Sequence, residues 1–154
     1  MDRTHDNRNV DSMAKKKNNK TKQNKTMSVL PAVIVVGVGG AIGAICRVGL
    51  GYYVMNVARS SFPWGTMVVN LAGCFLIGLL WSVFDHYGLS NQLKLLVISG
   101  GLGAFTTFST FGLEAIHLFS SGQVKLGVIY LVVSNVGGLV LVALGFGVSR
   151  LVLS

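Results

Sequence analysis

The sequence predicts an all-α membrane protein with four transmembrane helices, the third of which is broken at mid-membrane. Hydrophobic residues make up 51% of the 154 residues and charged residues only 12%, and the mean hydropathy is +0.63. A soluble domain carries roughly twice that charged fraction on its surface, about 25%. Four apolar runs long enough to cross a bilayer follow a polar start. The third run contains a cluster of Gly, Ser and Thr residues that a continuous helix does not favour.

The chain is predicted to divide into a disordered basic tail, residues 1–27, and a four-helix transmembrane domain, residues 28–154. Eight of the thirteen Lys and Arg residues precede residue 26, and the tail is too polar to bury a core. Most of the net charge of +8 therefore lies in the tail, and we expect no nucleic-acid partner. Met1 and Met27 are both candidates for the first residue of the protein. Mass measurement of the N-terminus would show which methionine is used.

The first span is expected over residues 28–57. Gly39 and Gly43 are four residues apart, a spacing that allows a second helix to approach closely. Arg47 interrupts the apolar run, which is costly unless its charge reaches the interface or lines a wet vestibule. An arginine that extends to the interface and an arginine that attracts anions are both consistent with this position.

The second span is expected over residues 60–84, which contain no charged residue. Asn70 lies near its middle, where an amide side chain must find a partner. Its NH2 group has two donors that suit a desolvated anion. The alternative is that Asn70 only hydrogen-bonds a neighbouring helix.

The third span, residues 93–119, contains the predicted break within residues 100–112. Each glycine inside a helix costs about 1 kcal/mol relative to alanine, and Ser and Thr compete for backbone partners. Backbone groups that a break leaves unpaired at bilayer depth need protein, water or an ion as partner. Phe105, Phe108 and Phe111 recur every three residues, and the last two share a face if the helix resumes at Thr107. Their ring edges carry partial positive charge and could contact a small anion.

The fourth span is expected over residues 124–149. Tyr130 and Ser134 are four residues apart and share one face, where their hydroxyl groups would form a strip of donors. Gly138 takes the next position on that face, so the strip has no third hydroxyl there.

Several motifs together resemble the Fluc fluoride channel family, also called the CrcB family. Residues 103–111, GAFTTFSTF, are similar to its TTFSTF signature, which is the most specific of the motifs. Residues 39–48 resemble the family's GGxxGAxxRY, with Val48 in place of tyrosine, and residues 65–73 resemble GTLxVNxxG, with Met67 in place of leucine. The resemblance covers about residues 31 to 139.

The resemblance implies a fluoride-specific ion channel that exports fluoride passively from the cytoplasm and so reduces its toxicity. It implies a fluoride pathway formed by polar and aromatic side chains: Asn70, Phe108, Phe111, Thr107, Ser109, Thr110, Tyr130, Ser134, Arg47 and Thr66. It also implies a structural sodium ion held by the main-chain carbonyls of Gly103 and Thr106 from two subunits. Between these two residues the chain has Ala104 where the family frequently has glycine, and Phe105 where it frequently has leucine.

The family resemblance further implies an antiparallel dimer of the dual-topology type in the cell membrane. Without the tail, Lys94 and Arg150 lie on one side of the four spans and Arg59 and Lys125 on the other. Because the two sides carry equal numbers of cations, the positive-inside rule predicts no preferred orientation. The tail would fix the N-terminus in the cytoplasm. Two assemblies are therefore open: a homodimer of both insertions, or a heterodimer with an oppositely oriented paralogue. We expect a multi-pass protein of a bacterial plasma membrane, in contact with lipid.

Two other classes of protein have to be weighed against a channel. A small multidrug-type proton antiporter also has four spans, but its mechanism needs a carboxylate embedded in the membrane, and the first span has none. A scaffold subunit would explain the glycine-rich packing but not the donors placed with the aromatic residues. An enzyme is not expected, since no nucleophile, base and orienting group, and no cluster of metal ligands, can be assembled.

Overall fold

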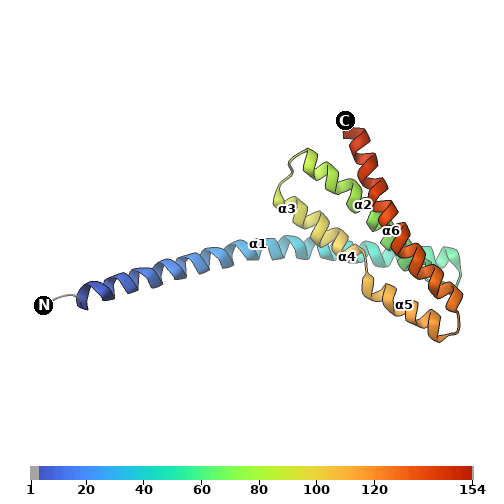
Figure 1. The fold of residues 1–154 in the computed structure, drawn as a ribbon, viewed down its shortest axis with the longest axis horizontal. Helices are drawn as coiled ribbons and strands as arrows, with labels where there is room; N and C mark the ends of the chain where they lie inside the picture. The colour runs from blue at the N-terminus through green and yellow to red at the C-terminus, as the bar shows by residue number, and fades with distance from the viewer. Residues whose placement is uncertain (1–3, 154) are drawn as a thin grey trace. The chain divides into compact units, whose positions relative to one another are not determined.

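The computed structural model describes the backbone of residues 4–153 and the side chains of residues 29–153. All the described regular structure is helical (Figure 1). The helices, in order, are α1 (Thr4–Ala58), α2 (Trp64–His86), α3 (Asn91–Lys94), the π-helix η1 (Leu95–Leu102), α4 (Gly103–Phe105), α5 (Phe108–Ser120) and α6 (Val124–Leu153). The chain divides into two compact units, Met1–Ile34 and Val35–Ser154, and the second unit contains the features that follow.

Four helical segments are long and apolar enough to cross a membrane, as the sequence predicts. They are Val29–Ala58, Trp64–His86, Asn91–Ser120 and Val124–Leu153. The all-α fold class and the multi-pass membrane character are thereby confirmed. The backbone of α1 is helical from Thr4, in the segment that we expect to be disordered; the state of this tail in solution is not tested and stays a prediction.

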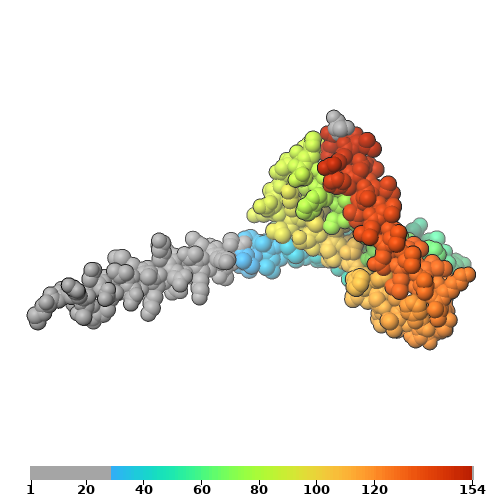
Figure 2. Space-filling model, viewed as in Figure 1, coloured from blue at the N-terminus to red at the C-terminus, as the bar shows by residue number. Residues whose placement is uncertain are grey.

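The second and fourth spans, α2 and α6, pack against one another (Figure 2). A Cβ atom at Gly78 of α2 would overlap the carbonyl oxygen of Val142, and one at Gly145 of α6 would overlap that of Phe75. Glycine at both positions therefore permits the close approach. Such small residues allow helices in lipid to gain van der Waals contact.

A similar contact joins α1 to the π-helix η1. A Cβ atom at Gly39 would overlap the carbonyl oxygen of Leu96, and one at Gly43 would overlap that of Gly101. The Gly39 and Gly43 pair thus supports the close helix approach that its spacing predicts. Only the short helix α4 separates the wide turns of η1 from the interruption of the third span, and π-helical turns often occur at functional sites.

The third span is interrupted at Thr106 and Thr107, inside the segment where the sequence predicts a break. Both residues have extended backbone, with φ −81° and ψ 155° at Thr106 and φ −146° and ψ 115° at Thr107. The helix resumes at Phe108, where the Thr107 hydroxyl accepts a hydrogen bond from the Thr110 amide at 3.3 Å. This is an N-cap, which satisfies one of the donors that a new helix start leaves unpaired.

Candidate functional site

The break opens onto a hollow of about 480 Å³ between α2, the broken third span and α6. Seven of the residues assigned to the pathway or to the sodium site by the sequence line this hollow: Asn70, Gly103, Thr106, Thr107, Phe108, Phe111 and Ser134. Asn135 and Cys74 also line it. The fold thus brings together residues of three separate spans, although the first and last of the seven, Asn70 and Ser134, are 64 positions apart in the sequence.

Asn70 holds the interrupted backbone through both atoms of its amide. Its Oδ1 accepts a hydrogen bond from the Thr107 amide at 2.8 Å, and its Nδ2 donates to the Thr107 carbonyl at 3.0 Å. The side chain therefore replaces the helical partners that Thr107 has lost. Of the two uses that the sequence left open for Asn70, the bond to a neighbouring helix is present, and it uses only one of the two amide hydrogens.

The same contacts release two carbonyl groups from the helix. In a continuous helix the Thr107 amide would donate to Gly103, but here it donates to Asn70. The Thr110 amide would donate to Thr106, but here it donates to the Thr107 hydroxyl. The carbonyl oxygens of Gly103 and Thr106 are therefore available as hard ligands, as broken helices in membranes often provide.

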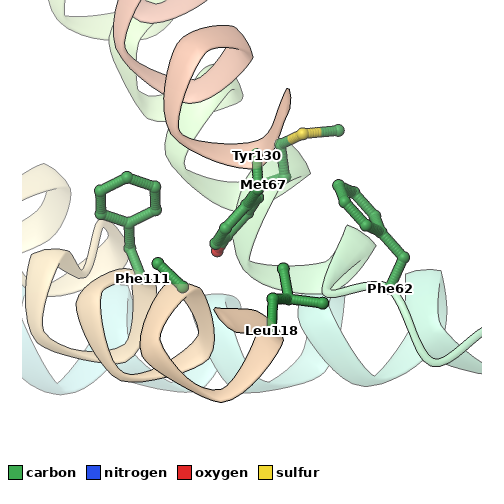
Figure 3. Close-up of a cluster of buried hydrophobic side chains, with 6 residues drawn as sticks. Phe62, Met67, Phe111, Leu118 and Tyr130 are labelled. Carbon is green, nitrogen blue, oxygen red and sulfur yellow. The ribbon is translucent and has the colours of Figure 1, made fainter. Parts of the chain in front are cut away.

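The two phenylalanines after the break have different surroundings. Phe111 is only 6% exposed and belongs to a core cluster with Phe62, Met67 and Tyr130 (Figure 3). Phe108 is 79% exposed, and its ring lies 5.6 Å from that of Phe111 between centroids, tilted by 48°. The pair shares one face, as predicted, but only Phe111 is covered by its own chain.

Tyr130 is fully buried and its hydroxyl is used inside the chain. Its ring lies between Phe111 at 5.0 Å and Phe62 at 5.6 Å (Figure 3). The hydroxyl donates to Glu114 Oε2 at 2.7 Å. The Thr66 hydroxyl donates to Glu114 Oε1 at 2.8 Å. Glu114 thus collects the hydroxyl groups of two residues that the sequence assigned to the pathway.

The role of Glu114 was not predicted from the sequence, where its position toward the end of the third span is typical of an ordinary interfacial residue. Two signals could have found it. An ionisable residue inside a span indicates a site by default, and Glu114 follows Phe111 by three residues, which places both on one helix face. Glu114 and Thr66 line a second hollow of about 420 Å³, together with His117 and Gln123. The carboxylate therefore lies where this outer hollow meets the aromatic cluster.

Ser134 contributes a hydroxyl with no partner of its own. Its Oγ is buried and forms no hydrogen bond with the described residues, although Ser134 lines the hollow at the break. A buried polar atom without a partner is costly, and it suggests a ligand or water. One turn further along α6, a Cβ atom at Gly138 would lie 3.2 Å from Cys74 Sγ, so the thiol occupies the space where a third hydroxyl would have been.

Besides Thr66 and Tyr130, which bind Glu114, three predicted pathway residues do not line this hollow. Ser109 and Thr110 are exposed on the first turn of α5, and the Thr107 hydroxyl donates to Thr110 Oγ1 at 3.0 Å. Arg47 is partly exposed on α1 and lines neither of the two hollows. Within the described chain, the structure therefore separates a hollow around Asn70 and Ser134 from these three residues.

The Glu114 network predicts a measurable loss of stability for Glu114→Gln. An amide still accepts from one hydroxyl but presents NH2 to the other, and hydrogen bonds to a charged group are worth about 1.5–3 kcal/mol. We expect the free energy of unfolding to fall by about 1–3 kcal/mol, seen as a lower melting temperature of the purified protein in detergent. Asp85→Asn, which neutralises an exposed carboxylate, should shift it far less. Equal shifts for both variants would contradict the network.

The sequence matches a known family and several proteins of known name. Residues 34–146 match the family described as CrcB-like protein, Camphor Resistance. A Salinibacter ruber protein named fluoride-specific ion channel FluC is 46% identical over 112 residues, 73% of this chain and 84% of its own. Proteins of the same name from Desulfotalea psychrophila and Rhizobium johnstonii are 40% and 42% identical, over 80% and 76% of this chain and 96% and 94% of their own.

Proposed function

The chain belongs to the CrcB family, and on that premise we propose that it is a fluoride-specific ion channel through which fluoride leaves the cytoplasm passively. The relatives reported above carry the name of such channels, which are not enzymes. The observation that carries the proposal is the interruption at Thr106 and Thr107, clamped by Asn70 and open to a hollow with a buried, unpaired hydroxyl.

The interruption separates two kinds of electrostatic environment. The carbonyls of Gly103 and Thr106 present partial negative charge at the end of α4. The start of α5 presents backbone amides and the positive end of the helix dipole, next to Phe108. A site for a small anion on the α5 side and a site for a cation on the carbonyl side follow from this arrangement.

Fluoride is small and strongly hydrated, so its path has to replace water with donors at close range. Ser134 Oγ and the second amide hydrogen of Asn70 supply such donors in the hollow at the break. The ring edges of Phe108 and Phe111 add weak positive potential there. Weak contacts of this kind suit conduction, because an ion that is held too strongly does not leave.

We assign Thr66 and Tyr130 to the pathway because both bind Glu114. Both hydroxyl groups donate to Glu114, which supports a role for them as donors to an anion. Fluoride that enters from the outer hollow would compete with Glu114 for them. We assign Arg47 to the approach of the ion, since a cation near a pore mouth raises the local concentration of anions.

The structural sodium ion of the family fits the residues present. Gly103 and Thr106 have main-chain oxygens released from the helix, the kind of hard ligand that such an ion prefers. Bound there, sodium would fix the geometry of the break and balance the partial charges of the carbonyls. Main-chain carbonyl oxygens are sufficient ligands for sodium, so this site needs no side-chain carboxylate.

A dimer is supported by what one chain leaves uncovered. Phe108 is 79% exposed although it lines the hollow, so a second subunit would complete the wall of the pathway. We propose the antiparallel arrangement that the family resemblance implies; without the tail, the balance of Lys and Arg around the spans leaves both insertions open. A homodimer and a heterodimer with a paralogue differ in one test: whether this chain conducts when it is expressed alone.

The competing antiporter has no support in these observations. It needs a carboxylate in the first span, and residues 29–58 contain none. Glu114, the carboxylate of the third span, is engaged by two hydroxyl groups. No relative reported above is named as an antiporter.

Fluoride efflux from liposomes that contain the purified chain tests the proposal. We expect efflux that follows the fluoride gradient, requires a counter-ion pathway such as valinomycin with potassium, and proceeds without a proton gradient. Liposomes loaded with chloride should release their anion far more slowly. Efflux that depended on a proton gradient would favour the antiporter, and no efflux from this chain alone, with efflux restored by a paralogue, would favour the heterodimer.

A further inference from the structure

Where α2 and α6 end, the protein has a third polar hollow, which the proposed pathway does not use. Both helices run toward the same side of the membrane, and their ends lie next to one another in Figures 1 and 2. The hollow measures about 450 Å³. Its polar lining consists of Trp81, Ser82, Asp85, His86 and Arg150, and Phe146 contributes an apolar wall.

We propose that this hollow binds the headgroup of a phospholipid that carries a phosphate and a primary ammonium, a phosphoethanolamine lipid. In this proposal the Arg150 side chain binds the phosphate. Its guanidinium lies over the Phe146 ring, 4.6 Å from the centroid, a contact that holds the planar group in place. Arginine presents its donors in a fork that matches phosphate oxygens.

Asp85 makes a zwitterionic headgroup a better occupant than an anionic one. It lines the same hollow as Arg150, yet no salt bridge joins the two among the described residues. A purely anionic headgroup would face this carboxylate and the partially negative C-terminal ends of two helices. An ammonium group favours the same surroundings, so both charges of a phosphoethanolamine find a partner.

The position suits a lipid headgroup. Trp81 is exposed at the end of its span, and tryptophan is enriched at the level of the headgroups. Three further side chains of the hollow have a donor for a phosphate oxygen: Trp81 through Nε1, Ser82 through its hydroxyl and His86 through its ring. The acyl chains of such a lipid would lie along the apolar residues of the same two spans.

Native mass spectrometry of the full, delipidated chain in detergent, with one added lipid at a time, tests the proposal. The three lipids share acyl chains and differ only in a phosphoethanolamine, phosphocholine or phosphoglycerol headgroup. We expect at least about threefold greater retention of the phosphoethanolamine lipid, since a quaternary ammonium cannot donate a hydrogen bond to Asp85 and phosphoglycerol has no ammonium. Equal retention of all three would overturn the proposal.

Three variants assign the charges. Arg150→Gln should lower retention of the phosphoethanolamine and phosphoglycerol lipids alike. Asp85→Asn should remove the preference between those two. Lys94→Gln, which neutralises a cation on the same side that does not line the hollow, should change neither. The proposal is overturned if Arg150→Gln and Lys94→Gln behave alike.

A water-soluble headgroup separates a lipid from a free phosphate compound. Glycerophosphoethanolamine has the charges of the lipid but no acyl chains. At a concentration equal to that of the lipid, it should not displace it, because the acyl chains add apolar contact. Displacement at equal concentration would mean that the hollow takes a soluble phosphate compound, and the assignment to lipid would be wrong.

Discussion

Replacing Asn70 with alanine is expected to lower the rate of fluoride efflux about a hundredfold. The change leaves the Thr107 amide and carbonyl without the partners that they have at 2.8 and 3.0 Å. Each buried group left unpaired costs about 1–3 kcal/mol, and about 2.7 kcal/mol in the barrier corresponds to a hundredfold in rate. The measurement is initial efflux from liposomes, normalised to the amount of folded protein.

Asn135→Ala is the matched control. Asn135 lines the same hollow, but its amide donates to the Leu131 carbonyl of its own helix, so its loss should leave efflux within about twofold, as surface changes cost about 0.5 kcal/mol or less. Asn70→Asp keeps an acceptor for the Thr107 amide but turns a carboxylate toward the Thr107 carbonyl, and it should be as inactive as Asn70→Ala. Full activity in both Asn70 variants would refute the clamp.

Phe108→Ile should reduce fluoride efflux at least about tenfold while the protein remains folded. Because Phe108 is 79% exposed in the chain, its replacement removes little packing from the subunit itself. What it removes is a ring edge beside the hollow, and a loss of about 1.4 kcal/mol for the desolvated ion corresponds to a tenfold fall in rate. The melting temperature of the variant, measured with its efflux, separates a lost pathway from a lost fold.

Tyr52→Ile serves as its control, because Tyr52 is an aromatic residue that is 71% exposed and lines neither hollow of the pathway. We expect normal efflux from this variant. If Phe108→Ile conducted like Tyr52→Ile, the assignment of the ring to the pathway would be wrong. If Phe108→Ile lost efflux together with its melting transition, the ring would be a packing residue of the assembly.

The sequence predicted the four spans and the place of the break with little dependence on tertiary contacts. Length and hydropathy are sufficient for a span, since a bilayer accepts only long apolar helices with internal hydrogen bonds. The break was predictable because Gly, Ser and Thr weaken a helix locally. The close approach at Gly39 and Gly43 was also predictable, since the distance between helices in lipid depends directly on the size of the facing residue.

The partners of the polar groups could not be predicted in the same way. Asn70 and Thr107 are 37 positions apart, and Thr66 and Glu114 are 48 apart, so no local pattern joins them. The sequence left two uses for Asn70 open, and nothing in it joined Glu114 to Thr66 or Tyr130. The sequence predicted that the hydroxyl groups of Tyr130 and Ser134 form one strip of donors. In the structure Tyr130 donates to Glu114, whereas Ser134 lines the hollow at the break.

By itself, then, the sequence determined that this chain crosses a membrane four times, that its third span is broken within residues 100–112, and which family motifs surround that break. Only the tertiary structure decided that Asn70 closes the broken backbone, that Phe111 is buried while Phe108 is left uncovered, and that Glu114 draws in Thr66 and Tyr130. The physical reason is that helix formation and burial in lipid are local and additive along the chain, whereas each polar group in an apolar medium is satisfied by whichever partner the packing of distant helices brings within about 3 Å.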